Sequence, residues 1–520
     1  MKYLMSIDQG TTSSRAILFD ERGRQCGVSQ KEFSQFFPND GWVEQDANEI
    51  WTSTVEVVQE LMKRNALSSG DLIAFGITNQ RETTVVWDRA TGEPLHRAVV
   101  WQDRRTADRC TQLTEDGHLE IVRRTTGLVI DPYFSATKVE WLIANGDLGQ
   151  SGDLAFGTID SWLIWKLTGG STFATDVTNA SRTLLYDIEK GSWSSDLCEL
   201  FGIPMNSLPE VLPSSGRFAV TGETSALGPG LPISGAIGDQ QSALFGQACF
   251  EVGMTKNTYG TGSFVLMNVG QTCPKPIEGL LSTIAWDLGD GPTYALEGSI
   301  FATGAAIQWL RDGLEVITHA SEIGDLAKSV PNSGGLFFVP AFAGLGSPWW
   351  DPRARGTIIG ITGGTKTGHL ARAVIEAIVF QTADVVSAMT KAGDLSVGEM
   401  RVDGGAAVVD LLLQLQANQI GSRVSRPTIT ETTAQGAAMI AGLAEGVWND
   451  KDEIADAWRL DEAFDPQEDR SESLMLHEQW LRATSCAREF AFRWPPPYFL
   501  CGSGDPGRNI DGPVWHYDHG

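Results

Sequence analysis

The stretch YLMSIDQGTTSSRAILFD, residues 3–20, decides the fold. An apolar run ends at Asp8, a turn of glycine and hydroxyl residues follows, and a second apolar run begins at Arg15. Two β-rich runs joined by a short glycine-containing turn predict a β-hairpin whose turn carries polar groups. The first strand is therefore expected to end at a turn whose polar groups could bind a ligand.

Similar runs recur along the chain and alternate with stretches of helical period. Apolar residues repeat at three and four positions in residues 48–64, 371–389 and 408–420, which predicts helices. Strands interleaved with helices indicate an α/β protein, and hairpins at 3–20 and at ITNQRE–TTVVWD (77–88) predict mixed sheets. The strand candidates end mostly at Gly, Asp or Asn: residues 3–10, 15–20, 72–80, 83–88, 232–240, 293–298, 336–344 and 400–405.

The composition excludes several classes of function. A chain of 520 residues with 42% hydrophobic and 20% charged residues predicts two or three globular domains. Its formal net charge of −26 disfavours binding to nucleic acid or anionic lipid. No apolar run reaches the length of a membrane span, the start lacks the features of a signal peptide, and the 7 cysteines form no CxxC pair. We expect a cytosolic protein with reduced thiols.

Three strand ends share one pattern, in which Asp is followed by Gly or Gln and then small residues. They are IDQGTT at 7–12, IGDQQS at 237–242 and VDGGAA at 402–407. Such ends can converge on one cleft if two similar domains face each other. We expect domains at 1–244 and 245–485, with an irregular tail at 486–520 that contains three successive prolines.

The turn after Asp8 predicts a phosphate site. Its hydroxyls and amides can surround phosphate oxygens, Arg15 adds a fixed positive charge, and Asp8 can hold Mg²⁺ through water. The donors are Thr11, Thr12, Ser13 and Ser14. The alternative is a polar hairpin turn with a solvated arginine.

Asp239 is the candidate general base. It follows an apolar strand, where a carboxylate is well placed to accept a hydroxyl proton during phosphoryl transfer. The alternative, favoured for Asp239 taken alone, is the N-cap of the helix predicted by QQSALFGQA. The two roles are compatible.

A polyol site is predicted from NQRET at 79–83. Arg81 and Glu82, with Tyr133 and Gln240, supply donors and acceptors for hydroxyl groups, and Trp101 and Phe264 can wall the carbon atoms. The alternatives are a surface ion pair for Arg81 and Glu82 and core packing for the aromatic rings.

The second half carries glycine turns suited to a nucleotide. Thr261 lies in the turn YGTGS, and Gly404 and Gly405 lack β-carbons, so a phosphate or a purine can approach the main chain. The segment GITGGTKT at 360–367 is a decoy, because Thr365 stands where the P-loop motif requires glycine before the lysine.

Taken together, these motifs resemble the glycerol kinases of the FGGY sugar-kinase family, within the actin-like and hexokinase-like superfold. The resemblance covers about residues 1–485 and is carried by SIDQGTTSSRAILFD, NQRET, DPYFSATK, GAIGDQQSALFGQ, NTYGTGSF and RVDGGAA. It implies two ribonuclease-H-like α/β domains with mixed sheets flanked by helices and an active-site cleft between them. It also implies phosphorylation of glycerol by Mg²⁺ and ATP in glycerol catabolism, and a homodimer or homotetramer.

The resemblance also assigns roles to residues. Asp239 would be the base, and Asp8 would bind Mg²⁺. Glycerol would be held by Arg81, Glu82, Tyr133, Asp239, Gln240, Trp101 and Phe264; the nucleotide would be held by Thr11, Thr12, Ser13, Arg15, Thr261, Gly304, Gln308 and Gly405. Val409 departs from the family, which has Asn there. A kinase for another small polyol or ketose and a non-catalytic nucleotide-gated regulatory protein are the alternatives.

Overall fold

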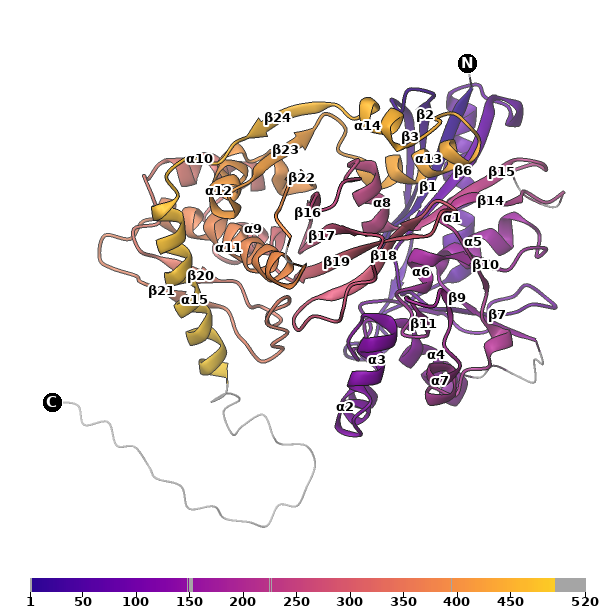
Figure 1. Ribbon diagram of the computed structural model, residues 1–520, viewed down its shortest axis with the longest axis horizontal. Coiled ribbons are helices and arrows are strands. Elements are labelled where there is room, and N and C mark those ends of the chain that lie inside the picture. Colours follow the sequence, from indigo (N-terminus) through magenta and orange to yellow (C-terminus); the bar gives the residue numbers. More distant parts are fainter. Residues whose placement is uncertain are drawn as a thin grey trace, which may run out of the picture.

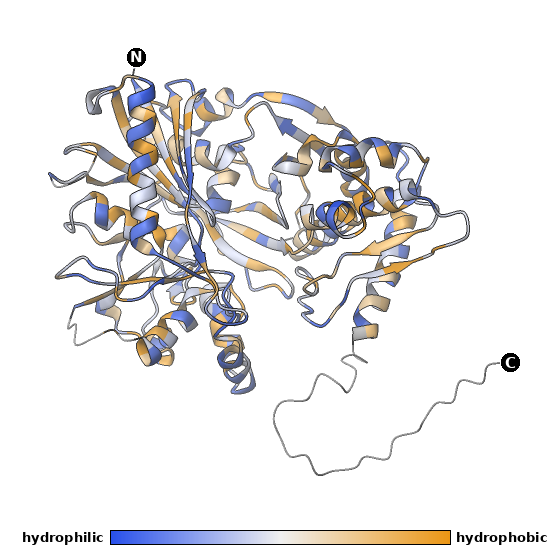
Figure 2. Cartoon of the chain, turned by 180° about the vertical axis from the view of Figure 1, so that it is seen from behind, coloured by the Kyte–Doolittle hydropathy of each residue, from blue (hydrophilic) through white to orange (hydrophobic). Residues whose placement is uncertain are grey.

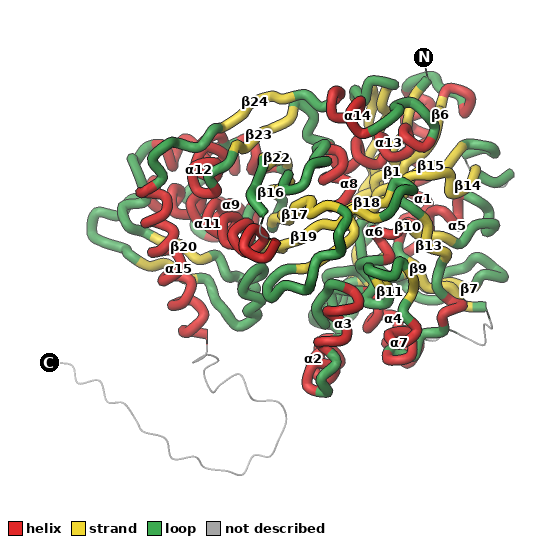
Figure 3. Tube along the Cα trace, viewed as in Figure 1, coloured by secondary structure: helices red, strands yellow, loops and turns green. Residues whose placement is uncertain are grey.

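The computed structural model describes residues 2–491, apart from 147, 149–152, 224, 226 and 394. Figure 1 shows two lobes, each built around a sheet, and Figure 3 shows the strands gathered between flanking helices. The predicted α/β class with mixed sheets is confirmed by the strand pairings of both lobes.

The first sheet has six strands in the order β14-β15-β6-β1-β2-β3. Their bounds are Ser215–Val220, Pro232–Gly238, Leu72–Asn79, Tyr3–Gln9, Ser13–Asp20 and Gln25–Glu32. The predicted hairpin is present, since β1 and β2 pair antiparallel with Asp8 opposite Arg15. Strands β1, β6 and β15 run parallel, so their carboxyl ends, and the polar residues that follow, lie along one edge of the sheet.

The second sheet repeats this topology with seven strands in the order β18-β19-β17-β16-β22-β23-β24. Their bounds are Leu281–Asp287, Pro292–Ile300, Ser263–Gly270, Thr255–Tyr259, Glu399–Asp403, Arg423–Pro427 and Leu460–Phe464. Strands β16 and β17 form a hairpin, and β16, β22 and β23 run parallel. The hairpin turn at 260–262 therefore corresponds to the turn at 10–12 of the first sheet.

Side chains alternate between the two faces of the first sheet. Met5 and Ile7 pack in the cluster under α1 (Ala47–Arg64) and α5 (Ile159–Leu167), whereas Leu4 packs in the cluster under α13 (Thr432–Ala444). Apolar residues follow the strands in both lobes, as the orange segments of Figure 2 show.

Helix α13 lies against the first sheet although it belongs to the second half of the chain. It contacts β6, β15 and α8 (Asp239–Gly246) closely enough to exclude a β-carbon. A Cβ on Gly436 would lie 1.9 Å from the carbonyl oxygen of Ser242, and one on Gly76 would lie 2.0 Å from that of Ala437. This packing fixes the helix that begins with the candidate base.

The second sheet is covered by α11 (Thr367–Gly393) and α12 (Asp410–Ile420), and α15 (Ser471–Ala491) packs against these two helices, with Trp480 stacked on Phe380. Residues 367–392 of α11 are long and apolar enough to cross a membrane, but 83% of the most apolar window is buried inside the protein, so this is a core helix. Helix α15 continues to Ala491, which corrects the expectation of irregular structure at 486–491; the remainder of the expected tail lies outside the described residues.

The predicted second hairpin is wrong. Strand β7 (Val85–Asp88) pairs with β9 (Leu154–Gly157), while β6 pairs with β1 and β15. Glu82 has a φ of +63°, and this left-handed residue turns the chain out of the first sheet.

The remaining elements connect these layers. The shorter strands are β4 (Gln35–Phe36), β5 (Glu44–Gln45), β8 (Ala98–Val99), β10 (Ala174–Asp176), β11 (Tyr186–Asp187), β12 (Ser192–Trp193), β13 (Glu210–Leu212), β20 (Phe337–Val339) and β21 (Thr357–Ile359). The shorter α-helices are α2 (Ala107–Glu115), α3 (Leu119–Thr126), α4 (Ser135–Asn145), α6 (Val177–Ala180), α7 (Ser195–Leu200), α9 (Gly304–Gln308), α10 (Ile323–Lys328) and α14 (Lys451–Ala457). Single turns are η1 (Ser69–Asp71), η2 (Met205–Ser207), η3 (Trp309–Gly313), η4 (Ala320–Glu322) and η5 (Gly405–Val408).

Candidate active site

Asp8 and Asp239 lie at the same edge of the first sheet, at the ends of the strands β1 and β15 that flank β6. Arg15 pairs with Asp8, and its Nη1 lies 2.6 Å from Glu431 Oε2 in the segment before α13. Burial raises the pKa of Asp8, Arg15 opposes that rise, and the negative charge of Asp239 adds to it. The two strand-end carboxylates are therefore close enough to interact.

Asp239 is the first residue of α8 rather than its N-cap, which is Gly238. Its Oδ1 lies 3.2 Å from Nε of Arg81 and accepts the main-chain N–H of Gln240 at 2.7 Å. The side chain is 32% exposed, whereas that of Arg81 is 1% exposed. The Asp239 carboxylate is thus fixed by Arg81 and by the main chain of Gln240, and part of it remains accessible to solvent.

Arg81 is fixed from the second sheet. Glu297 on β19 lies 2.6 Å from Arg81 Nη1 and accepts from Arg182 at 2.9 Å. Burial alone would raise the pKa of Glu297, but Arg182 and Arg81 together lower it to about 2. Arg81 and Glu82 are not a surface ion pair, because both side chains are 1% exposed.

Glu82 is held in a strained conformation. Its Oε1 accepts from Arg182 Nε at 2.7 Å, and its carbonyl oxygen accepts from Ser135 Oγ at 3.0 Å. A left-handed backbone in a residue other than glycine costs of the order of 1–3 kcal/mol and is found mostly at functional sites.

The aromatic candidates lie beside this cluster. Tyr133 Oη accepts from Arg81 Nη2 at 3.3 Å, and its ring meets Trp101 edge to face with centroids 5.6 Å apart. The guanidinium carbon of Arg81 lies over the ring of Phe264, 6.0 Å from the ring centroid. All three rings are partly exposed, so they are not simply core residues.

Lys138 stabilises the conformation of the loop that carries Tyr133. Its buried ammonium donates to the carbonyl oxygens of Pro132, Tyr133 and Phe134 at 2.7, 2.6 and 3.0 Å. Burial lowers the pKa of Lys138 to about 8. The lysine of the DPYFSATK motif therefore shapes the loop that carries Tyr133.

The hydroxyl turn is only partly available to a ligand. Thr11 and Thr12 lie at the tip, and Thr11 Oγ1 accepts from the indole of Trp101 at 3.0 Å. Ser13 Oγ accepts from Gln30 at 3.0 Å. Ser14 is wrong as a phosphate donor, because its buried hydroxyl bonds to Ser53 at 2.9 Å on α1.

The nucleotide candidates of the second sheet form two adjacent glycine turns. Gly304 at the start of α9 donates to the carbonyl oxygen of Gly260 at 2.9 Å, and Ala305 donates to that of Thr261 at 3.0 Å. Gly404 has a φ of +86°, and a Cβ there would lie 2.5 Å from the carbonyl oxygen of Tyr259. The first turn is therefore hydrogen-bonded to the start of α9, and the second turn packs directly against the main chain of Tyr259, which precedes the first turn.

Beyond these turns the surface is open. Thr261, Gly405 and Gln308 are exposed, and a Cβ on Gly405 would meet no atom within 4 Å. Val409, which stands where the family has Asn, instead packs into the core of the second domain, against the backbone of Gly324.

Among the described residues, no group of three or more His, Cys, Asp or Glu is arranged to hold a metal ion. Asp8, the candidate magnesium ligand, pairs with Arg15 beside the hydroxyl turn.

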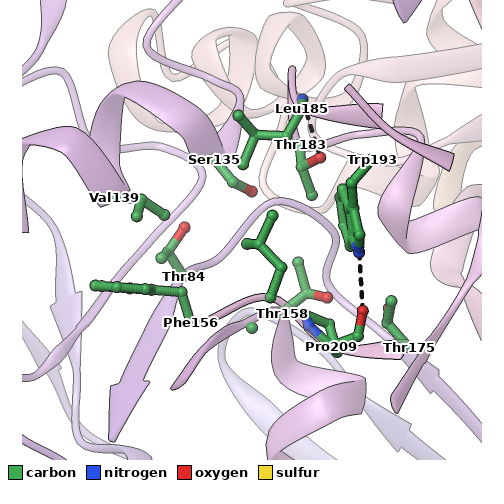
Figure 4. Close-up of a pocket in the computed structure, with 12 residues that line it drawn as sticks. Thr84, Ser135, Val139, Phe156, Thr158, Thr175, Thr183, Leu185, Trp193 and Pro209 are labelled. Carbon is green, nitrogen blue, oxygen red and sulfur yellow. Dashed lines mark hydrogen bonds between the residues drawn. The ribbon is translucent and has the colours of Figure 1, made fainter. Parts of the chain in front are cut away.

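A separate internal cavity lies behind Ser135 and Thr84 (Figure 4). Its volume is about 20 Å³, enough for a single water molecule, and Phe156, Leu185 and Trp193 form much of its wall. The cavity is too small for a polyol, so it is not the substrate site.

The sequence analysis missed four charged residues of the cluster: Lys138, Arg182, Lys256 and Glu297. Glu297 lies inside the apolar run TYALEG of β19, and a charged residue within a buried strand is rare unless it is paired, so a signal was available there. Lys256 lies in β16, whose sequence TKNTY is mostly polar although the strand is buried, so no such signal was available for it.

The chain belongs to the FGGY family of carbohydrate kinases, whose N-terminal domain model matches residues 3–246 and whose C-terminal domain model matches residues 255–445. The resemblance expected from the motifs is confirmed. Among curated relatives, glycerol kinase 2 of Thermotoga maritima is 52% identical over 93% of this chain and 98% of its own length. The glycerol kinase of Staphylococcus haemolyticus is 51% identical over 94% of this chain and 99% of its own length.

Solved structures agree with this placement. A glycerol kinase of Plasmodium falciparum crystallised with ADP has a TM-score of 0.89 and is 35% identical, covering 94% of this chain and 98% of its own. A gluconate kinase of Lactobacillus acidophilus has a TM-score of 0.85 at 22% identity, over 94% and 98% of the two chains, and shows the shared fold.

Proposed function

We propose that this protein transfers the γ-phosphoryl group of ATP to a terminal hydroxyl of glycerol and gives sn-glycerol 3-phosphate and ADP. The observation that carries the proposal is the held Asp239 carboxylate, open on one side, within a closed network of buried charges at the edge of the first sheet. The curated relatives with more than half of their residues identical are named glycerol kinases.

The cluster fits a small polyol. Asp239 presents an accessible acceptor, Tyr133 presents a hydroxyl beside partly exposed rings, and the buried Arg81 and Glu82 lie directly behind them. A site of buried polar groups rejects analogues that lack a hydroxyl by about 10⁴–10⁵, because its own groups would be left unpaired. Glycerol offers three hydroxyls on a short carbon chain, which matches this density of polar groups.

The proposed reaction is an in-line displacement. A terminal hydroxyl oxygen forms the new bond to phosphorus, the bond between the γ-phosphorus and the ADP oxygen breaks, and the hydroxyl proton passes to the Asp239 carboxylate. General-base catalysis of this kind contributes about 10²–10⁴ in rate. Arg81, held by Glu297, keeps the carboxylate in position.

The phosphates of ATP would meet Thr11, Thr12, Ser13 and Arg15, and Thr261, Gly304, Gln308 and Gly405 would line the nucleoside side. Mg²⁺ held near Asp8 would neutralise charge on the phosphates. Arg15 already bridges Asp8 and Glu431, so it stands where a phosphate would arrive. Domains at 1–244 and 245–485, a cytoplasmic location and a homodimer or homotetramer belong to the same proposal.

The test compares kcat/KM for glycerol, erythritol, xylulose and ribulose with Mg-ATP, and identifies the product. We expect glycerol to be preferred by at least tenfold. A preference for a ketose would move the protein to another kinase of the family. Nucleotide binding without turnover on any acceptor would favour a regulatory protein, and the Asp8–Asp239 pair argues against that outcome.

A further inference from the structure

Lys256 is a buried charge for which the proposed reaction has no assigned use. It lies on β16 of the second sheet, is fully buried, and its ammonium reaches toward the first sheet. Nζ donates to Gln240 Oε1 at 2.5 Å and to Thr258 Oγ1 at 2.9 Å. Taking an ammonium out of water costs several kcal/mol unless it is well paired, so this placement needs a reason.

The contact with Lys256 fixes the orientation of the Gln240 amide. An ammonium group can only donate, so the atom that faces it must be the amide oxygen. Among the described residues, no partner is recorded for the Gln240 Nε2 group, and the side chain is partly exposed next to Asp239. Gln240 therefore turns its amide oxygen toward Lys256 and its N–H donors away from it, toward the open side of Asp239.

We propose that Lys256 is a positioning residue of the acceptor site, which orients Gln240 so that its amide donates to a hydroxyl oxygen of the substrate. The proposal rests on the proposed function, because it assumes a polyol acceptor beside Asp239. It specifies the direction of the hydrogen bonds to the substrate: Gln240 donates to a hydroxyl oxygen, whereas the carboxylates of Asp239 and Glu82 accept from hydroxyl groups. One hydroxyl can then donate to a carboxylate and accept from Gln240, which an ether or keto oxygen cannot do.

The charge environment supports this role. The titratable and charged groups that face Lys256 are Asp403, Asp239, Arg81 and Glu297. Burial lowers the pKa of Lys256 to about 8, although the three carboxylates act in the opposite direction. The ammonium thus loses its proton near the upper end of the neutral range.

The main test is a double-mutant cycle on the full-length protein with Lys256→Met and Gln240→Ala. Each single change should raise the KM for glycerol by about 10- to 100-fold, the range for losing a hydrogen bond that involves a charged group, while the KM for ATP stays within about threefold. Because Lys256 acts through Gln240, the double variant should be no worse than Gln240→Ala. Multiplying effects, an equal rise in the KM for ATP, or an unchanged KM for glycerol in Lys256→Met would overturn the proposal.

A second measurement does not depend on the folding of Lys256→Met. In the unmodified protein the KM for glycerol should rise as the pH passes through about 8, and in Lys256→Arg, which keeps a charged donor, that rise should disappear. A pH profile that is the same in both proteins contradicts the inference. If the unmodified protein does not use glycerol, the proposed function fails, and the same cycle run on the acceptor it does use still decides the role of Lys256.

Discussion

The two sheets share the order of six strands, to which the second sheet adds β18 at one edge, but they differ in the residues at their strand ends. In the first sheet, Asp8 lies at the end of β1, Arg81 and Glu82 follow β6, and Asp239 follows β15. In the second sheet, the turns after β16 and β22 carry glycines, at 260, 262, 404 and 405. One scaffold thus supplies charged side chains for acid–base chemistry in one half and bare main chain for a nucleotide in the other.

The exceptions lie at the junction of the halves. Glu297 and Lys256 belong to the second sheet, yet Glu297 holds Arg81 and Lys256 holds Gln240. The acceptor site is therefore complete only when the two halves are in contact. Four changes test this division, in order of expected effect.

The largest effect should come from the first sheet. Asp239→Asn keeps the size of the side chain but cannot take a proton, so kcat should fall by about 10²–10⁴ while glycerol still binds by calorimetry. The control is Asp312→Asn, at an exposed carboxylate that pairs with its neighbour Arg311, which should leave kcat unchanged. Near-normal turnover by Asp239→Asn would remove the base assignment.

The second largest effect should come from the contact between the two halves, at Glu297. Glu297→Gln removes one of the two buried carboxylates that Arg81 and Arg182 share, the other being Glu82, and breaking a buried ion pair costs about 3–5 kcal/mol. We expect the free energy of unfolding in urea to fall by that amount. Glu462→Gln, an exposed partner of Arg426, should change it by less than about 1 kcal/mol. If both variants lost the same free energy of unfolding, the buried ion pairs between the two halves would contribute no more to stability than an exposed pair.

A pH effect should follow from a buried carboxylate pair in the first half. Burial raises the pKa of Asp176 to about 7, and the negative charge of Asp160 adds to the rise. The folded protein then binds a proton that the unfolded chain releases near 3.8, so this contribution to stability is lost as the pH rises through about 7.

Thermal unfolding from pH 5 to 8 should therefore show a steeper loss of stability in the unmodified protein than in Asp176→Asn. Asp187→Asn, at a more accessible aspartate of the same half, is the control for the loss of one charge. Parallel curves for the unmodified protein and Asp176→Asn would show that Asp176 does not titrate in this range.

The smallest effect distinguishes two neighbouring glycines of the second sheet. Gly405→Ala meets no atom and should fold normally, but its methyl group narrows the nucleotide approach, so the KM for ATP should rise a few-fold. Gly404→Ala forces a Cβ against Tyr259 at a φ of +86° and should lower the melting temperature. An unchanged KM for ATP in Gly405→Ala would place the nucleotide elsewhere.

Much of this arrangement was predictable from local sequence. The hairpin at 3–20, the helices α1, α11 and α12, and the strand-end positions of Asp8 and Asp239 follow from apolar periodicity and glycine turns. The pairing of β7 with β9 was not predictable, since it depends on the backbone of one residue, Glu82.

The partners of the site residues were also out of reach of the sequence. Glu297 lies 216 positions from Arg81, and no local pattern records such a contact. Ser14 looked equivalent to Thr11 in the sequence, but strand alternation points it into the core against Ser53. Burial and long-range pairing decide these roles.

The most direct test of the division between the sheets is the rate of ADP release by the unmodified protein, with saturating Mg-ATP and increasing glycerol. The account predicts a saturable rise to a kcat of about 1–100 s⁻¹, with little release in the absence of glycerol. Release that is independent of glycerol, or no release at any glycerol concentration, would contradict it.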